Sequence, residues 1–291
     1  MQGRIIKGIA GFYYVYCDDG KTYECKAKGI FRKDKKKPMV GDMVETKVLS
    51  EGDLTGNIVS LLPRKSELIR PAVANVDQAL IVFALTHPEP NYVLLDKLLL
   101  QFRLQELPVI LCFNKEDLVK EEETKRVRDI YKDSGSEVFF TCATGNQGVE
   151  ELKDQLRGKL SCVAGPSGVG KSSLINCLQE SVIAATGDIS RKAERGKHTT
   201  RHSEIIPIDQ DTFIMDTPGF SSFDVVSVTC DEIGDYYNEF SEYTGCRFQP
   251  CSHTHEPGCA VKEAVDEGLI SGERYNNYTT IYNEIKSLRR Y

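Results

Sequence analysis

The first 60 residues alternate between apolar and polar positions over short stretches that are separated by glycine-containing turns. The stretch 8–18, GIAGFYYVYCD, is rich in Tyr, Phe and Val, and KTYECKAKG follows a DDGK turn at 18–21. Similar stretches come at 41–49 (GDMVETKVL) and 56–62 (GNIVSLL). Such runs between turn residues predict β-strands. Several of them in so short a segment predict a small β-barrel, for which an OB-fold is the nearest architecture.

From Asp77 onward the apolar runs become continuous. Four of them are DQALIVFALT (77–86), LPVILCFN (107–114), EVFFTCA (137–143) and KLSCVAG (159–165). Continuous runs are typical of strands that are buried on both faces of a parallel sheet. Segments with helical spacing, such as 91–107, separate them. The alternation predicts an α/β domain with a mainly parallel sheet, to which 203–208 and 212–216 add two strands joined by a turn.

After about residue 225 the chain becomes acidic and rich in Tyr, Cys and His, and 230–240 and 273–288 predict short helices. The stretch 61–71 has a proline near each end and mixed charge, which indicates a linker. We therefore expect an α/β protein of three domains. They are an OB-like β-barrel (1–63), a nucleotide-binding α/β domain (64–225) and a mostly helical C-terminal domain (226–291).

Composition adds limits on location. No run of about 18 apolar residues exists, and the N-terminus does not have the pattern of a signal peptide. We therefore expect a cytoplasmic protein with no membrane partner. In that compartment, the ten cysteines are not expected to form disulfides. Scattered ones, such as Cys112, Cys162 and Cys177, are predicted to be small buried apolar residues.

The net charge of −6 argues weakly against a nucleic-acid partner, but it conceals a basic N-terminal segment. Residues 1–65 carry 13 basic and 8 acidic residues. Most of the basic ones gather around one predicted loop, namely Lys26, Lys28, Arg32, Lys33, Lys35, Lys36 and Lys37. OB-folds bind nucleic acid through faces and loops, so this loop is a candidate RNA contact; a solvated charge run is the alternative. Tyr13, Tyr14 and Tyr23 are candidates for base stacking, although core packing is expected for at least half of them.

A phosphate-binding loop follows the fourth apolar run. GPSGVGKS at 165–172 matches G-x-x-x-x-G-K-[ST] and precedes a helical segment, which is the context that this motif requires. Its glycines let backbone N–H groups face phosphates, Lys171 can reach the β- and γ-phosphates, and Ser172 can bind Mg²⁺. The candidate residues are Gly165, Pro166, Ser167, Gly168, Val169, Gly170, Lys171, Ser172 and Ser173. This loop alone does not choose between ATP and GTP.

A guanine-binding motif follows the second apolar run. Its residues are Asn114, Lys115, Glu116 and Asp117. An ionised carboxylate only accepts hydrogen bonds, so Asp117 can take both donors of the guanine edge, a pair that adenine does not have. The stem of Lys115 can pack along the base. The loop Thr141, Cys142 and Ala143 is similar to the S/T-x-A loop that lies behind the base in GTPases.

The D-x-x-G pattern comes last, at Asp216–Gly219. Asp216 is expected to hold Mg²⁺ through water, and the Gly219 N–H to contact the γ-phosphate. A threonine between the phosphate loop and this pattern normally completes the Mg²⁺ shell; Thr199 and Thr200 are both candidates. In ordinary GTPases the order is phosphate loop, switch threonine, D-x-x-G, N-K-x-D and S-x-A. Here the same cycle is cut after D-x-x-G, which predicts a circularly permuted GTPase domain.

The C-terminal segment contains a candidate metal site. Cys246, Cys251 and Cys259 enclose two histidines, His253 and His255. Three thiolates and one histidine suit a closed tetrahedral Zn²⁺ site, and the sequence offers both histidines as the fourth ligand. A small domain with few aliphatic residues needs such a metal for stability.

The motif order, the basic barrel-like segment, the PRKS linker and the Cys-Cys-His-Cys pattern together resemble the ribosome small subunit-dependent GTPase A family, over nearly the whole chain. The resemblance implies a GTPase of late small-subunit maturation that contacts ribosomal RNA and is stimulated by the subunit. It also implies zinc on Cys246, Cys251, His253 and Cys259. We expect GTP or GDP, Mg²⁺ and one structural Zn²⁺ as cofactors, and a monomer.

One position departs from Ras-like enzymes, which place a Gln after D-x-x-G to orient the attacking water. Here that residue is Phe220, so slow intrinsic hydrolysis is expected. In similar GTPases a histidine of the first switch is proposed to act instead, and His198 is the candidate; an exposed histidine without a role is the alternative. Two other functions remain open. One is a P-loop ATPase or small-molecule kinase, and the other is an RNA-binding assembly protein that uses GTP with negligible turnover.

Overall fold

The computed structural model describes residues 1–27, 37–68, 72–186, 204–216 and 228–288. The chain divides into two compact units. Unit 1 comprises Met1–Gln78, Lys153–Val163 and Ile175–Gly219, and unit 2 comprises Ala79–Leu152, Ala164–Leu174 and Phe220–Tyr291. The predicted α/β domain thus supplies segments to both units. In the described part of the chain, no helix has the length and apolar character needed to cross a bilayer.

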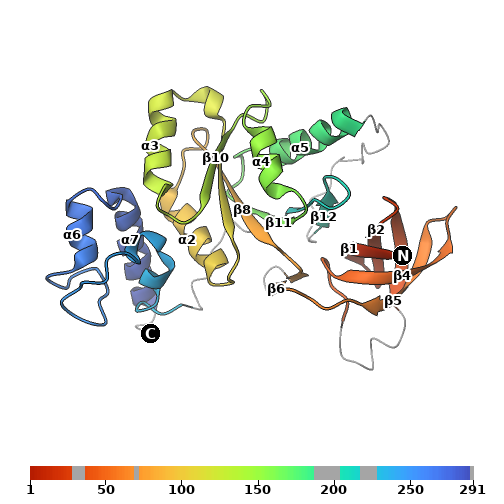
Figure 1. The fold of residues 1–291 in the computed structure, drawn as a ribbon, viewed down its shortest axis with the longest axis horizontal. Coiled ribbons are helices and arrows are strands. Elements are labelled where there is room, and N and C mark those ends of the chain that lie inside the picture. Colours follow the sequence, from red (N-terminus) through yellow and green to blue (C-terminus); the bar gives the residue numbers. More distant parts are fainter. Residues whose placement is uncertain (28–36, 69–71, 187–203, 217–227, 289–291) are drawn as a thin grey trace. The chain divides into compact units, whose positions relative to one another are not determined.

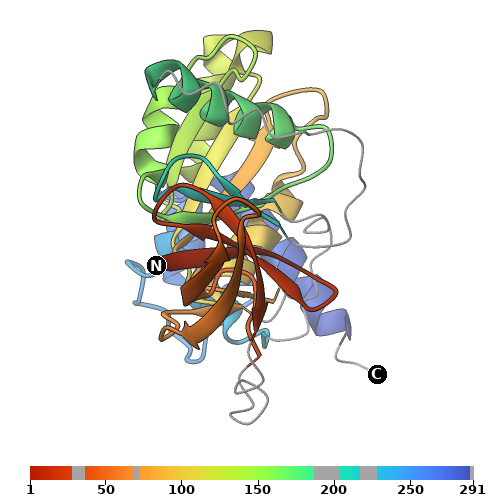
Figure 2. The ribbon, with the colours of Figure 1, turned by 90° about the vertical axis from the view of Figure 1, so that its right-hand side faces the viewer.

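Five strands at the N-terminus close into a barrel, as the alternating pattern predicts. They are β1 (Gln2–Ile9), β2 (Phe12–Cys17), β3 (Thr22–Ala27), β4 (Met43–Ser50) and β5 (Thr55–Leu61), in the order β1-β2-β3-β5-β4. Neighbours are antiparallel except β3 and β5, which run parallel. Figure 2 shows these strands, in red to orange, curling into the barrel. The core of the barrel includes Ile5, Val15, Val44 and Ile58.

The segment expected to be a linker is fastened to the barrel instead. Within it, β6 (Glu67–Leu68) pairs with β7 (Val73–Ala74). Arg64 donates two hydrogen bonds, of 2.7 and 2.9 Å, to the fully buried carboxylate of Asp42 in the barrel. The hydrogen bond to Asp42 raises the pKa of Arg64 above its already high value, so this bidentate pair stays charged. The prolines and mixed charge of this segment did not indicate that Arg64 pairs with Asp42.

The rest of unit 1 contains the strands that lead into and out of the nucleotide motifs. β11 (Leu160–Ala164) pairs in parallel with β13 (Phe213–Asp216), and β12 (Glu204–Pro207) pairs antiparallel with β13. Asp209 Oδ1 accepts hydrogen bonds from the backbone N–H groups of Asp211 (3.0 Å) and Thr212 (2.7 Å), which forms the turn between β12 and β13. This turn confirms the predicted hairpin.

Unit 2 is built on three parallel strands in the order β10-β9-β8. They are β8 (Gln78–Ala84), β9 (Val109–Asn114) and β10 (Glu137–Thr141). Every residue of β8 and β9 is buried, which explains their unbroken apolar sequence. The helical elements of the α/β region are α2 (Tyr92–Arg103), η1 (Glu116–Leu118), α3 (Glu121–Tyr131), α4 (Val149–Leu156) and α5 (Lys171–Thr186), most of which are labelled in Figure 1. Of these, α4 and α5 belong partly to unit 1. The described strand pairs of the α/β region are all parallel except β12–β13, which confirms the mainly parallel sheet.

The C-terminal part of unit 2 is helical, as predicted. Its elements are η4 (Ile233–Tyr236), η5 (Asn238–Phe240), α6 (Ala260–Asp266) and α7 (Gly272–Leu288). They enclose an apolar cluster around Ile233, Phe240, Tyr278 and Ile281. This cluster includes Leu100 of α2, so helix α7 is anchored on the nucleotide-binding part of the same unit.

Candidate nucleotide and metal sites

The phosphate loop lies between β11 and α5, and its glycines are required by close backbone contacts. A Cβ on Gly165, which has φ +136°, would lie 2.0 Å from the carbonyl oxygen of Val82. A Cβ on Gly170, with φ +95°, would lie 2.3 Å from Asn114 Nδ2. Only glycine fits at these two positions. The loop is therefore pressed against β8 and β9, and the sequence motif reflects packing as well as phosphate chemistry.

Lys171, the first residue of α5, folds back over the loop. Its Nζ donates to the carbonyl oxygens of Gly165 (2.7 Å) and Pro166 (2.6 Å). Phosphate oxygens accept hydrogen bonds from an ammonium group in the same way. Ser172 and Ser173 are exposed in the first turn of the helix, where the helix dipole favours anions. The arrangement therefore offers a positively charged cradle at a helix N-terminus.

Asn114 joins three of the predicted motifs. It ends β9 and is 2% exposed. Its Nδ2 donates to Val169 O in the phosphate loop at 2.9 Å. Its Oδ1 accepts from Thr141 Oγ1 and from Ala143 N, both at 3.2 Å. One buried amide thus ties the phosphate loop, the N-K-x-D motif and the T-C-A loop into one rigid arrangement within unit 2.

The side chains around this amide divide into buried supports and exposed groups. Thr141 is fully buried and Cys142 nearly so, and Cys142 Sγ accepts from Gly145 N at 3.2 Å. Asp117, by contrast, is exposed on η1, and Glu116 is half-buried beside it. The exposed carboxylate of Asp117 is available to a base that enters from solvent.

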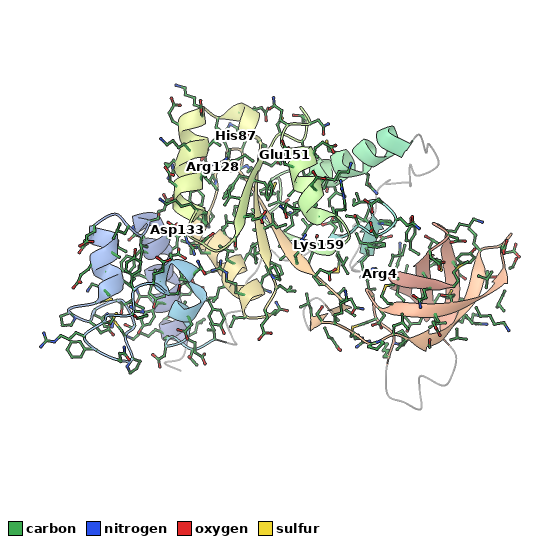
Figure 3. The ribbon with its side chains drawn as sticks, viewed as in Figure 1. Arg4, His87, Arg128, Asp133, Glu151 and Lys159 are labelled. Atoms are coloured by element: carbon green, nitrogen blue, oxygen red, sulfur yellow. The ribbon has the colours of Figure 1, made fainter. Side chains whose placement is uncertain are left out.

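Lys115 has a support that the sequence did not suggest. Its Nζ donates to Gly168 O at 2.9 Å and also to the carbonyl oxygen of His87. His87, labelled in Figure 3, follows β8 and has a left-handed backbone with φ 48°. A non-glycine residue in this region is uncommon. No local motif marks His87, and its position became visible only when β8 and β9 were placed side by side.

Asp216 belongs to unit 1, where it ends β13 and is half-buried. In the ladder it stands directly opposite Glu204, the first residue of β12. The other candidates of the switch regions lie outside the described residues. They are His198, Thr199, Thr200, Gly219 and Phe220.

The candidate metal ligands form one group. The ligand atoms of Cys246, Cys251, His253 and Cys259 all lie within 4.8 Å of one another. Cys246 Sγ lies 3.8 Å from Cys259 Sγ and 3.7 Å from His253 Nδ1, which is 3.3 Å from Cys259 Sγ. Tetrahedral zinc, with bonds of about 2.3 Å to sulfur and about 2.0 Å to nitrogen, separates its ligand atoms by about 3.5–3.8 Å. The donor set and its spacing therefore fit a metal ion.

His255, the other histidine that the sequence offered, is outside this group. It is exposed, and its Nδ1 lies 3.0 Å from Thr254 Oγ1. Burial lowers the pKa of His253, which favours the neutral imidazole that binds metals. Burial also raises the pKa of Cys251 to about 12. A bound cation would favour the thiolate form of Cys251, which is the form that binds metals.

Helix α7 and Glu256 hold the metal-ligand loop in shape. The hydroxyl groups of Tyr275 and Tyr278 donate to His253 O (2.8 Å) and Ser252 O (2.7 Å). Glu256 Oε1 accepts from Ser252 Oγ at 2.7 Å, and its carboxylate also accepts from backbone N–H groups of the loop. Burial acts to raise the pKa of Glu256, but these hydrogen bonds lower it to about 2. The loop is thus ordered by protein contacts as well as by its ligand set.

A P-loop tied through Asn114 to guanine-type motifs that precede it in the chain defines a nucleotide-binding protein of the circularly permuted GTPase class. A family model described as RsgA GTPase matches residues 61–226, and one described as RsgA N-terminal domain matches residues 2–58. The chain belongs to the RsgA GTPase family. This confirms the family resemblance and the GTPase class that the motifs predicted.

Relatives and solved structures are similar over the full length. A protein of Agathobacter rectalis named small ribosomal subunit biogenesis GTPase RsgA is 53% identical, and 100% of each chain is covered. A protein of the same name from Caldanaerobacter subterraneus subsp. tengcongensis is 47% identical over 100% of this chain and 98% of its own. The crystal structure of YjeQ from Thermotoga maritima has a TM-score of 0.80 at 33% identity and covers 100% of this chain and 99% of its own. YloQ, described as a circularly permuted GTPase, has a TM-score of 0.77 at 33% identity, with coverages of 100% and 96%. The permutation predicted from motif order is therefore confirmed.

Proposed function

We propose that this RsgA-family GTPase hydrolyses GTP to GDP and phosphate while it assists late maturation of the small ribosomal subunit. The observation that carries the nucleotide part is the buried Asn114 amide, which ties the phosphate loop to both guanine motifs. The ribosomal part rests on the names of relatives that match over the whole chain.

In this proposal, guanine is recognised by the exposed carboxylate of Asp117, which accepts from the two donors of its edge. Lys115 packs along the base, held by its hydrogen bond to Gly168 O. Ala143 lies behind the base, since its N–H is bound to Asn114. Adenine does not offer the paired donors, so an ATPase or kinase is disfavoured.

Backbone N–H groups of 165–173 and the ammonium group of Lys171 hold the β- and γ-phosphates. Ser172 and Asp216 are the residues that would hold Mg²⁺, which supplies further charge stabilisation when it is bound. Catalysis in this class is positioning and electrostatic stabilisation rather than covalent chemistry. Lys171 therefore contributes by neutralising negative charge as the bond from the γ-phosphorus to the β–γ bridging oxygen breaks, water takes the phosphoryl group and GDP leaves.

The attacking water is not oriented by the residue after D-x-x-G, because Phe220 has no hydrogen-bonding group. We assign that task to His198, with Gly219 and either Thr199 or Thr200 at the γ-phosphate. His198→Ala is then expected to impair subunit-stimulated turnover and to leave GTP affinity nearly unchanged. Unchanged stimulated turnover in this variant would remove His198 from the mechanism.

Zinc on Cys246, Cys251, His253 and Cys259 is proposed as a structural ion, because all four positions of a tetrahedron are filled by protein ligands. The three domains, at 1–63, 64–225 and 226–291, are assigned to RNA binding, nucleotide hydrolysis and zinc binding. We place the protein in the cytoplasm, as a monomer that contacts ribosomal RNA.

The barrel is the proposed RNA-binding part, and the basic residues around 26–37 are its proposed contacts. Of these, Lys28, Arg32, Lys33, Lys35 and Lys36 lie outside the described residues. Lys26 Nζ lies 5.0 Å from the centroid of the Phe12 ring on the barrel surface. Tyr13 and Tyr14 remain candidates for base stacking, since both are half-buried. Tyr23 is 1% exposed and belongs to the barrel core, so it is not a stacking residue.

The deciding experiment measures phosphate release from GTP and from ATP, each with and without purified small ribosomal subunits. We expect slow release from GTP alone, strong stimulation by the subunit, and no comparable release from ATP. Slow GTP hydrolysis that the subunit does not change would preserve the nucleotide site and refute the ribosomal role.

A second candidate function is favoured by Phe220. Without a water-orienting residue at that position, the protein can serve as an RNA-binding assembly factor that uses GTP as a structural switch with negligible turnover. This function predicts nucleotide-dependent binding to the subunit but no stimulated phosphate release. The same experiment therefore separates the two functions.

A further inference from the structure

The hairpin β12–β13 occupies a special position in the chain. It begins directly after 187–203, which contains the candidate switch residues His198, Thr199 and Thr200, and it ends at Asp216. Within unit 1, the barrel contacts this hairpin at its open end, where Glu204 pairs with Asp216, and at its turn end, where Pro207 pairs with Phe213. Figure 3 shows Arg4 on the side of the barrel nearest to the hairpin.

The first contact is an ion pair at the end of the hairpin. Lys7 Nζ of β1 lies 3.1 Å from Glu204 Oε1. The β1–β2 register shifts between Ile5 and Lys7, and an irregularity of this kind re-aims side chains. Glu204 stands directly opposite Asp216, and paired residues in a ladder share a face. Lys7 therefore compensates one of two carboxylates that would otherwise repel each other.

The second contact is at the turn end of the hairpin, where Phe213 begins β13. The guanidinium of Arg4 lies 4.8 Å from the centroid of the Phe213 ring, and the Tyr16 ring meets Phe213 edge-on at 5.8 Å. Arg4 and Tyr16 are ladder partners on β1 and β2, so both act on Phe213 from adjacent strands. At the turn, Gln210 Nε2 donates to Asp18 O at 3.2 Å.

These contacts are individually weak, which allows them to shift. Lys7 and Glu204 are 29% and 42% exposed, and ion pairs of this kind contribute little. Within the described residues, the buried Nε and Nη1 atoms of Arg4 have no hydrogen-bond partner. Burial lowers the pKa of Arg4, against the opposing charge of Asp77. The contacts between the barrel and the hairpin are thus weaker than the packing within each of these two elements.

We propose that Lys7 and Arg4 of the barrel are positioning residues for the nucleotide site, which hold the β12–β13 hairpin and couple the barrel to the strand that presents Asp216. A change of nucleotide that displaces Glu204 or Asp216 is then transmitted to β1 through Lys7. By the reciprocity of coupled binding, a phosphate-rich ligand on the barrel changes nucleotide affinity to the same degree. This inference rests on the proposed function, which assigns nucleotide binding to the GTPase domain and RNA binding to the barrel.

The test uses free full-length protein that is loaded with GDP or with the non-hydrolysable analogue GMPPNP. Amide hydrogen exchange is compared over residues 2–9 (β1), residues 204–216 (the hairpin) and residues 22–27 (β3) as a reference. In the wild type, exchange over β1 should differ between the two nucleotides by about two- to fivefold, the size expected of a partly exposed ion pair. Exchange over β3 should not differ.

Variants then separate coupling from a loss of structure. Each of the single variants Lys7→Met and Glu204→Gln should remove the difference in exchange over β1 between the two nucleotides. The double variant K7E/E204K, which exchanges the two charges, should restore this difference. Lys47→Met is the matched control, because Lys47 is an exposed lysine on β4 of the same barrel. It should retain the difference.

Two results would overturn the inference: equal exchange over β1 with both nucleotides in the wild type, or an undiminished difference in both Lys7→Met and Glu204→Gln. Since no ribosome is present, neither result depends on stimulation by the subunit. A failure to load either nucleotide would instead refute the proposed function itself.

Discussion

At the scale of single residues, the nucleotide site depends on polar groups whose partners lie far away in the sequence. Asn114 is the clearest case, because its amide has hydrogen bonds to Val169, Thr141 and Ala143. The N-K-x-D pattern identified this residue, but its partners required the fold. His87 shows the opposite situation, since only the structure places its carbonyl group at Lys115.

The left-handed backbone at His87 gives a testable prediction. Asn tolerates φ of +48° well, whereas a β-branched residue does not. His87→Val should therefore displace the carbonyl that supports Lys115 and weaken GDP affinity, with KM for GTP rising about tenfold. His87→Asn should behave like the wild type, and kcat should remain unchanged in both variants. Nucleotide titration and steady-state kinetics measure these effects. Equal GDP affinity and equal KM for GTP in His87→Val and His87→Asn would refute the role of His87.

At the scale of elements, two groups of polar side chains supplement the small apolar cluster of the C-terminal helices. One is the Cys-Cys-His-Cys group, and the other is a buried charge cluster on α7. In that cluster Arg274, which is 1% exposed, pairs with Asp96 of α2 and with Glu239 of η5. Burial acts to lower the pKa of Arg274, but the charges of Asp96 and Glu239 outweigh this effect and raise it.

Removal of the metal should unfold this part of the chain selectively. Cys251→Ser, or treatment of the wild type with a strong chelator, is expected to abolish bound zinc and to reduce helical content, because a closed site contributes folding free energy. Metal analysis and circular dichroism provide the measurements. Cys230→Ser is the control, since Cys230 packs on the same apolar cluster without being a ligand. Full zinc content in Cys251→Ser would contradict the assignment.

Loss of the buried arginine should be far more costly than loss of an exposed one on a neighbouring element. Arg274→Met leaves Asp96 and Glu239 buried without their partner, so the free energy of unfolding should fall by about 3–5 kcal/mol. Arg126 also pairs with α7, through Glu273, but is 47% exposed. Arg126→Met should cost less than about 1 kcal/mol. Urea unfolding compares the two variants, and similar losses would contradict the argument from burial.

At the scale of the whole molecule, the distribution of charge matters more than its sum. The net charge of −6 coexists with a basic segment at 1–65, which is the proposed RNA-binding part. Circular permutation adds a second consequence, because it connects D-x-x-G directly to the C-terminal region. The nucleotide site is therefore continuous in sequence with the part that contains the candidate metal ligands.

Charge reversal of the basic loop should weaken subunit binding in a salt-dependent way. Replacement of Lys33, Lys35, Lys36 and Lys37 by Glu removes up to four phosphate contacts, so the slope of log K against log salt should flatten by about 3–4. Reversal of three exposed lysines on or beside α3, namely Lys120, Lys125 and Lys132, is the control and should have little effect. Binding of subunits across a salt series is the measurement. Unaffected binding at physiological salt would refute the role of the loop.

The sequence by itself determined the class of this protein, because motif residues and strand patterns are local. The glycine spacing of the phosphate loop, the acceptor chemistry of Asp117 and the spacing of Cys246, Cys251 and Cys259 can be recognised without a fold. The order of the motifs then gave the permutation. The tertiary structure alone decided contacts between distant residues, since these depend on how strands and helices pack. It buried Arg274 against Asp96, fastened the expected linker to the barrel through Arg64, and set Glu204 opposite Asp216.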